Sequence, residues 1–131
     1  MIFNINDKFE ESFVVSKKTH QDFIQLSQDV NPLHTNGEFA LSKGFQGVVM
    51  HGNILNAFLS YFIGVCLPSK DVIIHSQDIQ FKNPVYLDDK LDFTAQVSGV
   101  FESVNAVEFK YYFRNLELKI VAKGKIQIGI I

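Results

Sequence analysis

Asp29 and His34 are the two residues of this sequence whose types and spacing best suit proton-transfer chemistry. A carboxylate and an imidazole can share a water molecule, one accepting its proton while the other supports the opposite transfer. Each such transfer typically contributes about 100- to 10,000-fold in rate. Asn31-Pro32 lies between them and makes the chain turn, so the two side chains can converge. The alternative is that Asp29 bonds its own backbone at a helix end and His34 is an ordinary, partly buried imidazole.

A second group of polar residues begins where a long apolar segment starts. Asn53, Asn56 and Ser60 have the spacing i, i+3 and i+7, which places them along one stripe of a helix. An unpaired buried polar group costs about 1 to 3 kcal/mol. These side chains therefore need partners, either in a binding pocket or on neighbouring strands or a partner subunit.

The remaining reactive residue types exclude several kinds of site. No cluster of His, Cys or carboxylates has metal-ligand spacing, no glycine-rich loop could hold a phosphate, and no Gly-x-Ser-x-Gly elbow occurs. We therefore expect no metal and no other cofactor. His20 and His75 are expected to be surface or helix-face residues. Cys66 lies in an apolar run and can form no internal disulfide, which indicates a small buried hydrophobe and fits a reducing cytoplasm.

The composition is that of one ordinary globular domain spanning residues 1–131. With 47% hydrophobic and 20% charged residues, the chain can form a real core. A net charge of −2 leaves no positive surplus for nucleic acid. Residues 1–11 lack the features of a signal peptide, and the apolar stretch from Ile54 to Leu67 is shorter than the roughly 20 residues that span a bilayer. We expect a cytoplasmic protein without a membrane or nucleic-acid partner.

Short helices are predicted before and after the Asp29 to His34 segment. Residues 9–15 suggest a strand, and Thr19 followed by Asp22 forms a variant of the capping box at the start of an amphipathic helix. This helix should stop near Val30, because a residue before proline is pushed out of the helical region.

Two further helices are predicted beyond the loop of residues 31–35. Asn36 can cap a short helix that runs through Ser42, and Gly44 is placed to end it in the left-handed conformation. From Gly52 to Cys66 the chain is apolar on nearly every face, which is typical of a helix buried on all sides.

The second half of the chain is rich in Val, Ile, Phe and Tyr. Strands are predicted over residues 72–81, 90–100, 104–115 and 118–130. Within the second of these, apolar residues at 91, 93, 95 and 97 alternate with polar ones, which indicates a sheet with one buried face. The short turns favour antiparallel pairing. Periodicity alone establishes an α+β arrangement of a helix packed on a sheet.

Several segments together resemble the signature of the MaoC-like, (R)-specific enoyl-CoA hydratases. They are SQDVNPLHTN at 27–36, FA at 39–40, GVVMHG at 47–52, LP at 67–68 and FKNPVYLDD at 81–89. The resemblance covers most of the chain, and a composite match of this length is specific. It implies the hot-dog fold, in which a curved antiparallel sheet wraps around a long buried central helix.

The resemblance implies chemistry on an acyl thioester. In this family an aspartate and a histidine five positions apart hold the water that adds reversibly, in the syn direction, across the double bond of an enoyl thioester. Asp29 and His34 match these two residues. The implied substrate is carried by CoA or by an acyl carrier protein, and the implied assembly is a homodimer with exposed strand edges paired.

Other positions are implied to bind the substrate. Gly52 matches the family glycine at the start of the central helix, where a backbone N–H can stabilise a thioester oxyanion. It can equally relieve crowding where the loop enters the core. Ser60 matches a serine that lines the active site, and Asn53 and Asn31 complete the substrate-binding candidates. His51 is also in the family pattern and is expected to fix the loop.

Three positions depart from the family pattern. Gln28 and Asp88 stand where glycine is common, and Asn53 stands where an apolar residue usually follows His-Gly. The polar group of Asn53 hints at an acyl chain that carries oxygen, or at a short one. Two alternative functions remain open, a thioester hydrolase and an acyl-thioester-binding domain without turnover, because a fold does not fix a function.

Overall fold

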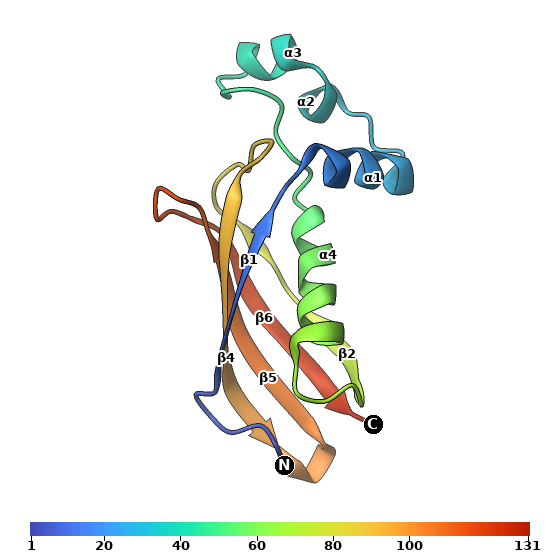
Figure 1. The fold of residues 1–131 in the computed structure, drawn as a ribbon, viewed down its shortest axis with the longest axis vertical. Coiled ribbons are helices and arrows are strands. Elements are labelled where there is room, and N and C mark those ends of the chain that lie inside the picture. The colour runs from blue at the N-terminus through green and yellow to red at the C-terminus, as the bar shows by residue number, and fades with distance from the viewer.

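In the computed structural model, which describes residues 1–131, a six-stranded antiparallel sheet carries a long helix across one face (Figure 1). The sheet order is β1-β4-β5-β6-β2, and β3 pairs with β6. The predicted architecture is confirmed, except that the predicted strand over residues 72–81 is divided into two. The strands are β1 (Lys8–Val14), β2 (Val72–Gln77), β3 (Gln80–Phe81), β4 (Lys90–Phe101), β5 (Ala106–Arg114) and β6 (Ile120–Ile130).

The core lies between the helix and the face of the sheet that the helix covers. Its strand side is set by the alternation in β4, since Leu91, Phe93, Ala95 and Val97 are all buried, as predicted. The ring of Phe62, from the helix, packs 4.9 Å from the ring of Phe93. Aromatic pairs at this spacing add to the stabilisation from burying apolar area.

Three short helices lie beyond one end of the sheet (Figure 1). The first, α1 (Lys17–Ser27), begins earlier than predicted, because Ser16 accepts the Thr19 N–H at 3.1 Å and is the N-cap. It also ends earlier than Val30, because Gln28 is left-handed with φ of 59°.

The segment after α1 contains more helix than predicted. The predicted loop at 31–35 includes α2 (Pro32–Thr35), whose first residue is a proline. The next helix, α3 (Gly37–Ser42), is confirmed, with Asn36 capping it and Gly44 left-handed at φ of 90°.

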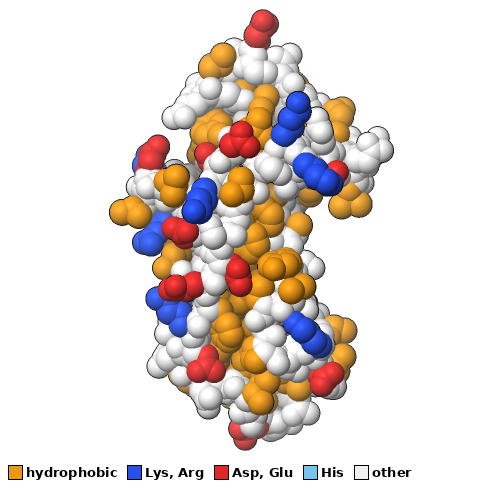
Figure 2. All heavy atoms as spheres, in the orientation of Figure 1, with side chains coloured by type: hydrophobic (Ala, Val, Ile, Leu, Met, Phe, Trp, Pro, Cys, Tyr) orange, Lys and Arg blue, Asp and Glu red, His pale blue; other side chains and the backbone are white.

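The long helix consists of α4 (Ile54–Tyr61) and a π-helical turn at Phe62–Cys66. The prediction that it is buried on all sides is wrong for the single chain. One face is buried, while Tyr61 is 49% and Val65 54% exposed on the other. Figure 2 shows hydrophobic side chains gathered on the surface along the middle of the molecule. No helix of the structure combines the length and apolar character needed to cross a bilayer.

Candidate active site

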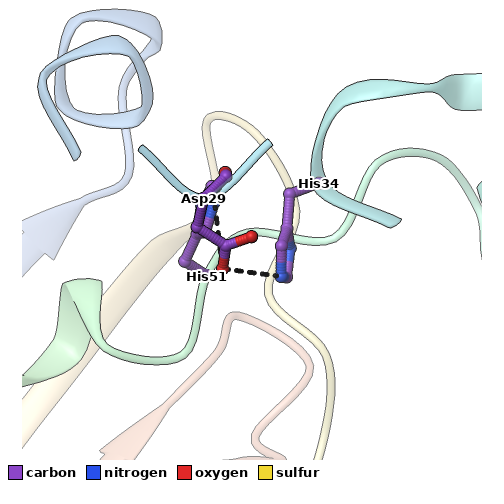
Figure 3. Close-up of side chains that lie close together, drawn as sticks. All are labelled: Asp29, His34 and His51. Carbon is purple, nitrogen blue, oxygen red and sulfur yellow. Dashed lines mark hydrogen bonds and ion pairs between the residues drawn. The ribbon is translucent and has the colours of Figure 1, made fainter. Parts of the chain in front are cut away.

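The bend between α1 and α2 positions Asp29 and His34. The left-handed backbone at Gln28 turns the chain out of α1. Asp29 Oδ1 then accepts the Asn31 N–H at 3.1 Å, and Asn31 Oδ1 accepts the Leu33 N–H at 2.9 Å and so caps α2. These local hydrogen bonds close a tight loop in which Asp29 and His34 face each other (Figure 3). Asp29 does bond its own neighbouring backbone, but through Oδ1 only.

The other carboxylate oxygen of Asp29 faces two imidazoles. Asp29 Oδ2 lies 3.9 Å from Nε2 of His34 and 3.9 Å from Nε2 of His51. This distance is too long for a direct hydrogen bond, but a water placed between the groups can bond to both. The Asp29 side chain is 47% exposed and that of His34 18%, so a small molecule can reach the space between them.

The proton positions on His34 follow from its other contact. His34 Nδ1 lies 2.7 Å from the carbonyl oxygen of Val49. A carbonyl oxygen can only accept, so Nδ1 carries a proton. Nε2, which faces Asp29, is therefore the atom at which His34 gains or loses its second proton.

Two further histidines, which the sequence did not indicate as catalytic, contact this pair. His51 Nε2 lies 2.9 Å from the backbone oxygen of Asp29, and His20 Nε2 lies 3.0 Å from that of His34. His51 is buried, and this burial lowers its pKa below the ordinary 6.5. His20 lies on a face of α1, one of the two positions expected for it, and this face is half-buried against α2. No local pattern reports these contacts, which join residues 14 and 22 positions apart.

The site contains one cluster of ligand types that the sequence spacing did not indicate. Ligand atoms of Asp29, His34 and His51 all lie within 4.8 Å of one another. The Nε2 of His51, however, must carry a proton to bond the Asp29 carbonyl, so it has no lone pair for a metal ion. Asp29 and His34 are then the two remaining donors, fewer than the three or more protein ligands usual at a zinc site. The donor set does not fit a metal centre.

A pocket of about 410 Å³ opens beside His34. Its wall includes Gly52 and Asn53 at the start of α4, together with Phe81 and Val85. The Gly52 N–H has no acceptor within the protein. The first N–H groups that bond back along the chain here are those of Ile54, to the His51 carbonyl, and Leu55, to the Gly52 carbonyl. A free N–H at a helix start can receive a negative oxygen.

The other predicted binding residues lie at different distances from this pocket. Asn53 lines it, and its Oδ1 accepts from Asn56, which in turn accepts from Gln77, both at 2.8 Å. Asn31 lies outside the pocket lining and uses Oδ1 as the cap of α2. Ser60 is exposed on α4, also outside the lining. Of the predicted residues, His34, Gly52 and Asn53 line the pocket. Asp29 lies outside the lining but reaches it through His34, at 3.9 Å from Nε2, whereas Asn31 and Ser60 lie apart from the cavity.

Comparison with known proteins gives concordant results. The family model described as "MaoC like domain" matches residues 5–112. The (R)-specific enoyl-CoA hydratase of Aeromonas caviae is 35% identical over 61% of this chain, and the match spans 60% of that protein's length. A mitochondrial 3-hydroxyacyl-[acyl-carrier-protein] dehydratase of Arabidopsis thaliana is 26% identical over 95% of this chain and 75% of its own.

Solved structures agree on the fold. The (R)-hydratase from A. caviae involved in PHA biosynthesis superposes on this chain with a TM-score of 0.91. The superposition covers 99% of this chain and 98% of that chain, at 24% sequence identity. At this identity the likeness concerns the arrangement of the backbone.

Proposed function

This chain belongs to the MaoC-like domain family, and on that premise we propose that it is a hydro-lyase that adds water to a 2-enoyl thioester or removes it from a 3-hydroxyacyl thioester. The observation that carries the proposal is the 3.9 Å gap between Asp29 Oδ2 and His34 Nε2, beside a pocket that His34 lines. The named functions of the two similar proteins, an enoyl-CoA hydratase and a hydroxyacyl carrier-protein dehydratase, support the same reaction read in opposite directions.

In the hydration direction, the water held between the two groups attacks the β-carbon of the substrate. Asp29 accepts a proton from this water as the new carbon–oxygen bond forms. The electrons of the double bond move toward the thioester, and protonated His34 donates from Nε2 to the α-carbon on the same face. Proton exchange between Asp29 and His34 then restores both groups. Dehydration follows the same steps in reverse.

Charge that develops on the thioester oxygen needs a fixed donor. The Gly52 N–H is the candidate, since it is free of protein acceptors and lies on the same pocket wall. Asn53 lies next to it and offers its side-chain amide to the acyl group. Asn31 and Ser60 remain predicted substrate contacts, and neither lines the pocket of the single chain.

The carrier of the thioester and the assembly are further parts of the proposal. The reaction requires no cofactor besides the CoA or acyl carrier protein that bears the acyl group. We propose a homodimer, because β1 and β2 are open sheet edges and one face of the long helix is apolar and exposed.

The test follows the conjugated enoyl-thioester absorbance in the ultraviolet when purified protein is mixed with crotonyl-CoA. Asp29→Asn and His34→Ala are each expected to lower kcat by about 100-fold or more while leaving the circular dichroism spectrum and Tm unchanged. Full activity in both variants overturns the proposal. Release of free CoA thiol would favour the hydrolase, and binding without turnover over a panel of enoyl thioesters would favour the binding domain.

A further inference from the structure

Three of the four histidines of this chain gather around the proposed site. The rings of His34 and His51 are stacked, with centroids 3.9 Å apart and planes inclined by 26°. His20 lies on the other side of His51, at a centroid distance of 5.6 Å. Only His34 lines the pocket, so the other two need an explanation of their own.

His20 and His51 each bond the backbone of one member of the Asp29–His34 pair. His51 Nε2 donates to the carbonyl oxygen of Asp29 at 2.9 Å, and His20 Nε2 donates to that of His34 at 3.0 Å. Both acceptors are carbonyl oxygens, so both Nε2 atoms carry the proton. The two histidines come from separate elements: His20 from α1 and His51 from the loop before α4.

The contact from His51 is the more consequential one. Every other hydrogen bond made by residues 28–31 is local, to partners at most five positions away. The bond to His51 therefore ties the Asp29 segment to the core, where His51 is only 4% exposed. Without it, only these local hydrogen bonds would hold the exposed carboxylate in place relative to His34.

The same ring also restrains His34. A buried planar surface 3.9 Å from the imidazole limits its rotation, while Val49 holds Nδ1. His51 has a buried Nδ1 without a hydrogen-bond partner, so only its Nε2–H and its flat face contact the pair. The burial that lowers the pKa of His51 favours its neutral ring. A neutral His51 does not compete with His34 as the charged partner of the Asp29 carboxylate.

We propose that His51 is a positioning residue that sets the separation of Asp29 and His34 through one hydrogen bond and one stacked face, with His20 as a second, weaker support on His34. The inference rests on the proposed function for its kinetic consequence, but the geometric claim stands independently. Displacements near 1 Å in a catalytic pair can cost about 100-fold in rate.

The experiment compares His51→Phe, which keeps a flat ring without the donor, with His51→Gln, which keeps an N–H near the Nε2 position. His75→Gln is the matched control, because His75 is an exposed histidine on β2 away from the pocket. We expect His51→Phe to lower kcat by about 100-fold with KM within about threefold, His51→Gln to recover most of the loss, and the control to match wild type. In an Asp29→Asn background, His51→Phe should lower kcat further by less than about threefold, because its effect passes through Asp29.

A second readout needs no substrate. Crystal structures of wild type, His51→Phe and His51→Gln give the Asp29 Oδ2 to His34 Nε2 distance directly. A changed distance in the Phe variant and a restored one in the Gln variant support the inference. An unchanged distance in the Phe variant overturns it, whatever the rate does, and so does a changed distance with full activity. If wild type shows no hydration, the proposed function fails while these distances still decide the role of His51.

Discussion

The ring of Phe81 lies against Gly52 so closely that a β-carbon on residue 52 would sit 2.7 Å from a ring carbon. This contact is by itself a steric reason for a glycine at the start of α4, because a larger residue would collide with the ring. The proposed role of the free Gly52 N–H as oxyanion donor is a second reason for a glycine, and the two reasons are compatible. Because Phe81 belongs to the pocket wall, any side chain at position 52 also reshapes the cavity.

Gly52→Ala is expected to lower kcat/KM for crotonyl-CoA by about tenfold or more, because the new methyl displaces the Phe81 ring. The double variant Gly52→Ala with Phe81→Ala should recover part of this loss if space is the cause. Gly64→Ala is the control, since nothing lies within 4 Å of a β-carbon there. Equal activity of Gly52→Ala and Gly64→Ala would show that the contact has no influence on the site.

Gln28→Gly and Asp88→Gly should each raise the free energy of unfolding by about 0.5 to 1 kcal/mol. Both residues have left-handed backbones, with φ of 59° and 66°, which glycine adopts without the penalty of a β-carbon. At both positions, glycine is common in the MaoC-like pattern that this sequence resembles. Urea unfolding measures the change, and Gln25→Gly inside α1 should instead lose about 1 kcal/mol.

Stability should fall on acidification as His51 is forced to take up a proton. Its folded pKa lies below 6.5 because of burial, so the unfolded chain binds this proton more readily. The contribution is complete above about pH 6.5 and is lost as pH falls through the folded pKa. The free energy of unfolding at about pH 7.5 and about pH 5.5 checks this. The free energy of unfolding lost between these two pH values should be smaller in His51→Gln. An identical loss in the variant would mean that other groups cause the acid destabilisation.

Cys66 should react slowly with thiol reagents in the folded protein. Burial, followed by a hydrogen bond with Glu11, raises its pKa to about 11. The thiolate fraction at about pH 8 is then roughly a thousandth. Reaction with a disulfide reagent should accelerate strongly in urea and moderately in Glu11→Gln, and a folded rate equal to the unfolded one would contradict this environment.

Light scattering at micromolar concentration should give a mass near twice 14.9 kDa. Val65→Glu, on the exposed apolar face of the long helix, is expected to weaken association if that face is covered by a second copy. Lys43→Glu, which places a similar charge on an exposed surface residue, is the control. A monomer for wild type would count against the homodimer.

Short-range patterns in the sequence were enough for much of the framework. The alternation of Leu91 and Phe93 with polar neighbours located the buried face of β4, and Asn36 with Gly44 located both ends of α3. Asn31-Pro32 indicated the bend between Asp29 and His34. These signals work because capping, turn formation and one-sided burial are decided within a few residues of chain.

The tertiary structure decided which distant groups meet. Nothing near His20 or His51 in the sequence indicates that each bonds the backbone of a residue 14 or 22 positions away. The packing of Phe81 on Gly52, and the exposure of one face of an apolar helix, likewise depend on how β3 and α4 are placed against the sheet. Such contacts arise when the core closes, because burial is a property of the whole fold and not of a local segment.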